Sequence, residues 1–204
     1  MPQGGYAQYR LGSEVPFSGA GHRATIELDY KTNTAGMLII TSAITEMFDS
    51  TGVVVNSEAD APIIHEELSS GRSHISVKKN TQITIKLAAN KKWRFSNLYD
   101  AITTKEELTQ FYGKLTYDRK SVIEDNGEFA GHQAVMFYAK YDDVGRIGSS
   151  HGFSMNIDLL QSGTPATGVW LPITIDPEIK NPPGSGGGKA LKDALGNPVP
   201  VPIS

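Results

Sequence analysis

Apolar and polar residues alternate along several segments of this chain, as they do in strands with one buried face. The alternation is clear at residues 26–30, 83–87 and 153–159, where every second side chain is apolar. Because successive side chains of a strand point to opposite faces, each segment predicts a strand with one face on a core and the other in water. Further strands are predicted at 37–44, 74–78, 93–98, 133–141 and 169–175.

These predicted strands should take different places in their sheets. Segments 37–44 and 133–141 are apolar on both faces, which favours central positions. Segment 169–175 contains Pro172, which cannot donate a backbone hydrogen bond, so this strand should lie at an edge or contain a bulge. The pair Asn126-Gly127 is typical of a tight turn between two strands.

One segment has the pattern of a helix instead. Thr104 and Glu107 have the spacing of a capping box, and Leu108, Phe111 and Tyr112 would then lie on one helical face. We therefore predict a mainly β fold: an antiparallel two-sheet β-sandwich of about eight strands, with one short helix near 104–113.

The two ends of the chain differ in composition from its middle. Residues 1–22 are rich in Gly, Gln, Tyr, Pro and Ser and predict a flexible N-terminal arm before a β-sandwich domain at 23–181. Residues 182–204 read as a Gly- and Pro-rich linker and C-terminal tail. In this tail Val199, Val201 and Ile203 alternate with proline, a spacing that suits docking in a groove on a neighbouring subunit.

Composition narrows the classes of protein to consider. The chain has 204 residues, about one domain, and no cysteine, so neither disulfides nor thiolate zinc sites are expected. Lys and Arg total 19 against 22 Asp and Glu, a balance that argues against a nucleic-acid partner. Without a secretory signal or a long apolar run, we expect a cytoplasmic protein with no membrane contact.

A glycine-rich stretch resembles a phosphate-binding loop only superficially. Residues 184–189 read Gly-Ser-Gly-Gly-Gly-Lys, but Pro183 and Ala190 stand where the motif needs Gly and Ser or Thr. A flexible spacer explains this composition better, and we predict no cofactor.

Other candidate chemistry also lacks the required spacing. His151, Ser154 and Asp158 suggest a catalytic triad, but on one strand His151 points away from the other two. The histidines form no metal-binding pair; they are His22, His65, His74, His132 and His151. A shallow calcium site in the acidic loops stays open as an alternative. We predict no catalytic or metal-binding residue.

Trp170 is the side chain most suggestive of a binding surface. It alternates with Val169, Leu171 and Ile173, so it would be exposed if those three face the core. An exposed Trp is common at binding surfaces, and packing under a loop is the alternative.

The last predicted strand runs into Asp176-Pro177-Glu178-Ile179-Lys180-Asn181. This ending, after a Trp-x-Phe strand at Trp93 and Phe95, resembles the inclusion-body protein family typified by PixA and AidA. The resemblance implies a small bacterial β-sandwich protein with a tendency to self-associate, and it supplies no catalytic residue.

These observations favour a non-enzymatic structural or interaction protein that self-assembles, as a homo-oligomer, through its terminal arms. The alternative is a β-sandwich module that binds a carbohydrate or another small ligand, with Trp170 and the acidic loops as the reason. An enzyme would need a pocket that gathers His and carboxylate side chains from separate strands, and no local pattern indicates one. We therefore predict that the protein is not an enzyme.

Overall fold

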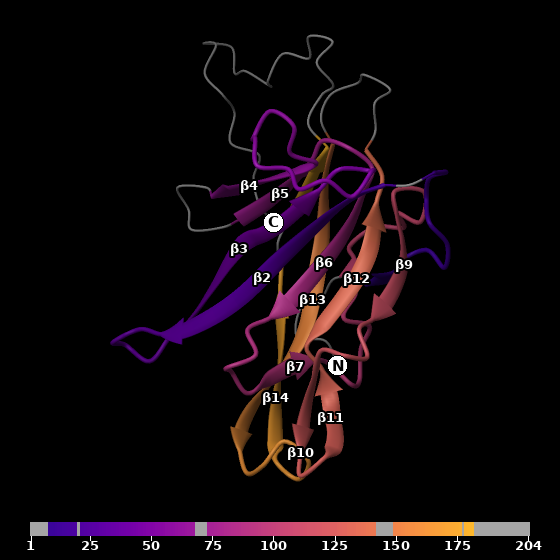
Figure 1. Ribbon diagram of the computed structural model, residues 1–204. Helices are drawn as coiled ribbons and strands as arrows, with labels where there is room; N and C mark the ends of the chain where they lie inside the picture. The colour runs from indigo at the N-terminus through magenta and orange to yellow at the C-terminus, as the bar shows by residue number, and fades with distance from the viewer. Residues whose placement is uncertain (1–7, 20, 68–72, 142–148, 177, 182–204) are drawn as a thin grey trace, which may run out of the picture.

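The computed structural model describes residues 8–19, 21–67, 73–141, 149–176 and 178–181. The described chain is mainly β, and its strands form an eight-stranded sheet, a five-stranded sheet and a separate two-stranded hairpin (Figure 1). This confirms the predicted fold class at the level of mainly β structure.

The five-stranded sheet contains the clearest alternating segments. Its spatial order is β3 (Leu38–Phe48), β2 (His22–Thr32), β6 (Thr81–Leu87), β12 (Ala134–Ala139) and β9 (Tyr112–Tyr117). Neighbours are antiparallel except for β2 and β6, which run parallel. The long β2–β3 hairpin extends away from the other strands in Figure 1.

The eight-stranded sheet is organised around its longest strand, β13 (Ser149–Ser162). The path through the sheet is β1 (Tyr9–Arg10), β8 (Ile102–Thr104), β13, β15 (Glu178–Asn181), β5 (Ser73–Val77) and β4 (Ile63–Glu67), and β7 (Trp93–Phe95) and β14 (Val169–Ile175) also pair with β13. β15 and β5 are parallel, and the other pairs are antiparallel. β13 therefore fixes the positions of four other strands.

The hairpin consists of β10 (Val122–Asp125) and β11 (Glu128–His132). Its turn residues Asn126 and Gly127 both have positive φ angles, 53° and 81°, as a two-residue hairpin turn requires. This confirms the turn predicted from Asn-Gly. β10 and β11 pair with each other, and in the described chain neither joins the ladder of a large sheet.

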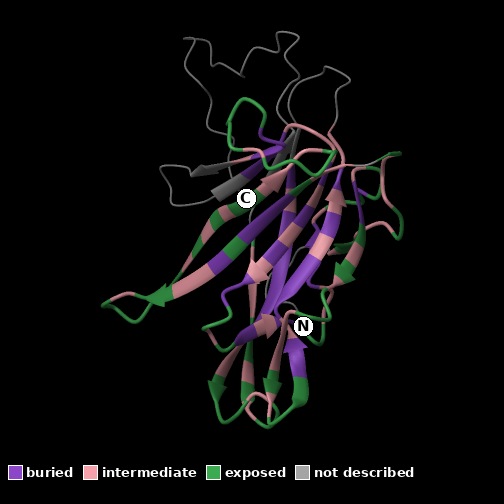
Figure 2. Ribbon diagram, viewed as in Figure 1, coloured by how far each residue is buried: buried purple, intermediate pink, exposed green. Residues whose placement is uncertain are grey.

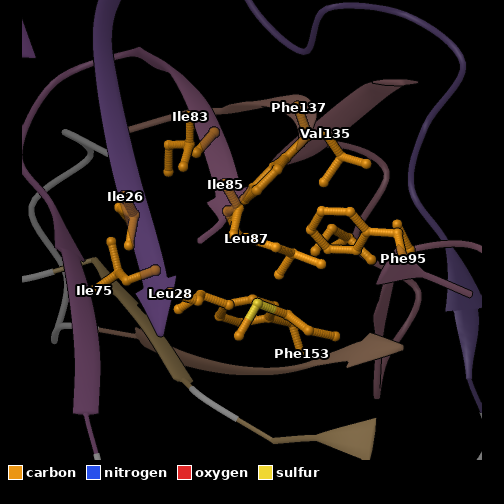
Figure 3. Packing of buried hydrophobic residues seen from close by; sticks show 14 of the residues in the cluster. Ile26, Leu28, Ile75, Ile83, Ile85, Leu87, Phe95, Val135, Phe137 and Phe153 are labelled. Atoms are coloured by element: carbon orange, nitrogen blue, oxygen red, sulfur yellow. The ribbon is translucent and has the colours of Figure 1, made fainter. Parts of the chain in front are cut away.

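The inward faces of the two large sheets share one hydrophobic core. Ile83 and Ile85 of β6 and Phe137 of β12 lie in the same buried cluster as Phe95 of β7 and Phe153 of β13 (Figure 3). Burial is concentrated on the central strands, whereas the ends of the β2–β3 and β10–β11 hairpins are exposed (Figure 2). The alternation in the sequence therefore identified the core correctly for these strands.

The predicted helix near 104–113 is wrong, and the described residues contain no helix. Thr104 belongs to β8, where it pairs with Phe153, and its hydroxyl donates to the Glu106 carbonyl oxygen at 2.7 Å. The amides of Phe111 and Tyr112 both donate to the Leu108 carbonyl oxygen, which makes a single turn before β9 begins. Pairing of β8 and β9 in the two sheets overrides the local helical preference.

The predicted strand positions are confirmed in two cases and wrong in one. β12 is central, between β6 and β9, and β14 pairs with β13 alone among the described strands, as Pro172 indicated. β3 is an edge strand rather than a central one, and Leu38 and Ile39 are exposed there. The structure also has more strands than about eight, because strands as short as β1 and β8 carry too few residues to show a period.

The segment predicted as an N-terminal arm makes sheet contacts where it is described. Tyr9 and Arg10 form β1 against Thr104 and Thr103, and the Gly12 amide donates to the Tyr112 carbonyl oxygen at 3.0 Å. The predicted C-terminal tail lies outside the described residues.

Replacement of Phe137 tests the position of the core. Phe137 is 1% exposed and Phe129 is 56% exposed, so the same change should have different effects at the two sites. We expect Phe137→Ala to lower the free energy of unfolding by about 3–5 kcal/mol and Phe129→Ala by less than about 1 kcal/mol. Urea denaturation followed by circular dichroism measures both, and equal losses would contradict this core.

Candidate functional site

A pocket of about 680 Å³ opens where the eight-stranded sheet, the five-stranded sheet and the β10–β11 hairpin meet. Gln8 and Arg10 come from the N-terminal segment, residues 96–100 from the loop between β7 and β8, and Thr103 from β8. Tyr117 of β9 and Phe129 and His132 of β11 complete the lining. The pocket therefore gathers side chains from five separate segments of the chain.

One wall of the pocket is aromatic. The His132 ring lies 4.9 Å from the Phe129 ring and 5.1 Å from the Tyr117 ring, between centroids. Phe129 and Leu98 are both largely exposed, although their side chains are apolar. A planar apolar group can stack on such rings without displacing any part of the core.

Two residues that line the pocket, Gln8 and Thr103, belong to a hydrogen-bonded polar network. The Gln8 side-chain oxygen accepts from the Thr103 hydroxyl at 3.2 Å and from the Asn156 amide at 3.5 Å. Asn156 also donates to the Asp100 carbonyl oxygen at 2.9 Å and accepts from the Thr174 hydroxyl at 3.1 Å. These bonds join the N-terminal segment, the 96–101 loop, β8 and β14 to β13.

This network corrects one part of the sequence prediction. The polar face of 153–159 was expected in water, but Ser154, Asn156 and Asp158 are all buried. The groups that bond to them come from the N-terminal segment, the 96–101 loop, Arg94 of β7, Thr174 of β14 and Asp176, so both faces of β13 are covered.

An ion pair lies at the mouth of the pocket. The Arg10 Nε lies 2.8 Å from an Asp100 carboxylate oxygen, with the Arg10 side chain 85% exposed and that of Asp100 29% exposed. Such an exposed pair contributes about 0–1 kcal/mol to stability. Because the pair is weak and accessible, the Arg10 guanidinium can bind another anion with little loss of folding stability.

The family comparison bears directly on this pocket. A family model described as "Predicted novel nucleotide synthetase" matches residues 5–184, which include every residue that lines the pocket. The chain belongs to this family. Neither a curated protein nor a solved structure matches the chain.

Membership of the nucleotide synthetase family corrects the interpretation made from sequence. The resemblance to the PixA and AidA inclusion-body family is wrong, since the family found is a different one. The prediction of a non-enzymatic, self-assembling structural protein is also wrong, because a synthetase is an enzyme. A closing Asp-Pro turn after a strand is too common a feature to identify a family.

The side chain of Trp170 is oriented differently from the expectation. Val169 and Leu171 are exposed, whereas Trp170 is half-buried, with the Arg94 guanidinium 3.9 Å from the centre of its ring. Its indole N–H donates to the Pro165 carbonyl oxygen at 3.2 Å. Its predicted role in binding a partner stays a prediction.

The other candidate residues are not brought together in the described structure. His151 is buried, with Nδ1 2.7 Å from the Tyr112 hydroxyl, whereas Ser154 donates to Asp176 at 2.8 Å. Within the described residues, no group of three or more His, Asp or Glu side chains is placed to hold a metal ion. The described residues also include no helix with the length and hydrophobicity needed to cross a bilayer.

Three of the predicted interaction residues, Val199, Val201 and Ile203, lie outside the described residues, and their docking role stays a prediction.

The sequence analysis did not identify the residues that line the pocket. Arg10 lies in the segment that was predicted to be an arm. Phe129 and His132 lie on the short strand β11, which has no period-two alternation of apolar residues. The Asn126-Gly127 turn was the one local signal of the hairpin that carries both rings.

Tyr117 predicts a measurable dependence of stability on pH. Burial raises the pKa of Tyr117 above its ordinary value, the bond from the Ala101 N–H partly opposes this, and the Asp100 carboxylate adds to the rise. The folded phenol thus keeps its proton when the unfolded one loses it, near pH 10. The stability that this contributes is present below about pH 10 and lost as the pH rises further.

We therefore expect the free energy of unfolding to fall less steeply above about pH 10 in Tyr117→Phe than in the unsubstituted protein. Tyr30 and Tyr112, whose pKa values burial also raises, are present in both chains, so the difference isolates Tyr117. Urea denaturation at a series of alkaline pH values measures it. Parallel curves for the two proteins would contradict the assignment.

Proposed function

We propose that this protein is an enzyme that forms a nucleotide, and that the pocket between β1, β8, β9 and β11 binds that nucleotide. Family membership supports the reaction class, and the pocket supports the location. The observation that carries the location is the combination, in one pocket, of accessible aromatic rings with an exposed arginine. We also propose that the two large sheets form a two-sheet sandwich that acts as a rigid support for this pocket.

The aromatic wall suits the base of a nucleotide. Every nucleobase has a flat π face, and Phe129 offers a ring that is 56% exposed, beside the His132 ring at 4.9 Å. Stacking of a base on an aromatic side chain contributes about 1–3 kcal/mol. Leu98, which also lines this pocket and is exposed, adds an apolar surface that the base would cover.

The polar side of the pocket suits the sugar and a phosphate. Arg10 presents a planar guanidinium, which binds phosphate oxygens through two parallel hydrogen bonds. Its present partner is the Asp100 carboxylate, with which a phosphate of higher negative charge would compete for the guanidinium. Ser96 and Thr103, which also line the pocket, carry hydroxyl groups that can bond to a ribose.

Removal of the exposed ring tests the base site. We expect Phe129→Ala to weaken binding of a nucleoside monophosphate by about 1–3 kcal/mol, which is roughly 5- to 150-fold in Kd. Isothermal titration calorimetry with the four common ribonucleoside monophosphates measures this. Met37→Ala is the matched control, because Met37 is an equally exposed apolar residue on the β2–β3 hairpin, outside the pocket. Equal effects of the two substitutions would refute the base site.

Replacement of the arginine tests the phosphate site separately. We expect Arg10→Gln to weaken binding of the monophosphate about tenfold and to leave binding of the unphosphorylated nucleoside unchanged. The salt dependence of binding should also become shallower, since one charge contact is lost. Lys31→Gln, at the exposed end of β2, is the control for a general charge effect. Equal losses for nucleoside and monophosphate would place the phosphate elsewhere.

The reaction itself is tested by product analysis. The full chain would be incubated with mixtures of nucleosides, bases and nucleoside triphosphates, and new nucleotides would be sought by liquid chromatography and mass spectrometry. Product formation that is lost in Phe129→Ala and kept in Met37→Ala supports the proposal. Product formation that neither Phe129→Ala nor Arg10→Gln alters would show that the active site lies outside this pocket.

The predicted cytoplasmic location stays a prediction.

A further inference from the structure

The β10–β11 hairpin supplies the aromatic wall but lies outside both large sheets. Phe129 and His132 belong to β11, and the hairpin's ladder consists of β10 and β11 alone in the described chain. Strands of a large sheet are positioned by many parallel backbone hydrogen bonds, and this hairpin has no such ladder to the body of the protein. Its position must therefore depend on individual contacts.

The backbone of β11 has an irregularity at the point of attachment. Gly131 pairs with Ile123 and Phe129 pairs with Glu124, so Ala130 is an extra residue without a partner across the hairpin. This is a β-bulge, which turns the side chains on either side of it and frees a carbonyl group. The freed Ala130 carbonyl oxygen accepts a hydrogen bond from Nη1 of Arg94.

Gly131 allows the hairpin to lie directly against the same arginine. A Cβ atom built on Gly131 would overlap the Arg94 side chain and would lie 3.0 Å from the Arg94 Cβ. Only glycine permits this approach without moving one of the two segments. Contact with Arg94 thus involves both the carbonyl of the bulge and the residue after it.

Arg94 is itself held firmly from the opposite side. Its Nε donates to an Asp158 carboxylate oxygen at 3.1 Å, and the two side chains are 12% and 5% exposed. The Trp170 ring stacks on the guanidinium at 3.9 Å. Arg94 therefore joins β7, β13 and β14 of the eight-stranded sheet to the hairpin.

We propose that Arg94 is a positioning residue, which holds the bulge of β11 so that Phe129 and His132 form the wall of the pocket. Its effect on a nucleotide rests on the proposed function, whereas its effect on the hairpin does not. Trp170 and Asp158 act through it, since they fix the orientation of the guanidinium.

Arg94→Lys is the informative substitution, because lysine keeps the charge beside Asp158 and loses both the planar stack and the forked donor. We expect hydrogen exchange in 122–132 to become at least about tenfold faster, with exchange in β6 and β12 unchanged. Mass spectrometry of the full chain without ligand measures this. A uniform rise that includes β6 and β12, or no change at the hairpin, would overturn the proposal.

A second pair of variants covers the case in which Arg94→Lys fails to fold. Trp170→Phe keeps an aromatic face over the guanidinium and should keep slow exchange in the hairpin, whereas Trp170→Ala should accelerate it. Equal exchange rates in these two variants would also overturn the proposal.

Binding gives the readout that connects Arg94 to the pocket. We expect Arg94→Lys and Trp170→Ala to raise the Kd of a nucleoside monophosphate about tenfold, and Trp170→Phe to leave it near that of the unsubstituted protein. If the unsubstituted protein binds no nucleotide, the proposed function fails while the exchange data still decide the role of Arg94. If the hairpin loosens and nucleotide binding stays unchanged, Arg94 does not position the wall of the pocket.

Discussion

The structure depends on the need to satisfy both faces of β13. One face carries Phe153, Met155 and Ile157, which are buried in the shared core. The other carries Ser154, Asn156 and Asp158, which are equally buried and so require hydrogen-bond partners. The N-terminal segment, the 96–101 loop, Arg94, β14 and Asp176 provide these partners. The polar face of one long strand thereby determines which segments cover it.

The pocket follows from this arrangement. Gln8 and Thr103 bond to the polar face of β13 or to each other, and they also line the pocket. The aromatic wall stands on the hairpin that Arg94 joins to Asp158 on the same face. The candidate site of this member of a predicted nucleotide synthetase family is thus built on the outer side of the sheet, while the hydrophobic core lies on the inner side.

Sequence patterns predicted the core-facing side of the eight-stranded sheet well and its pocket-facing side poorly. Alternation found the strands that bury Ile85, Phe137 and Phe153, because hydrophobic burial leaves a period of two in the chain. It could not show that Asn156 is buried, since a polar residue on a strand has the same pattern whether water or Gln8 is its partner. The prediction of a helix after Thr104 was wrong because β8 and β9 pair with strands that are distant in sequence. The pocket could not be predicted because its residues come together only in the folded chain.

The separate ladder of the hairpin has a consequence for how the pocket can vary. Because β10 and β11 share no backbone hydrogen bonds with the large sheets in the described chain, their length and tip can change without shifting the register of any core strand. Such changes must preserve the contacts of the hairpin described above, which are the Ala130 bulge and Gly131 against Arg94 and the His132 ring against Tyr117 of β9. The hairpin is thus a wall of the pocket that can change in length and sequence while the strands of the two large sheets stay the same. Such changes would alter which ligand fits the pocket without altering the stability of the fold.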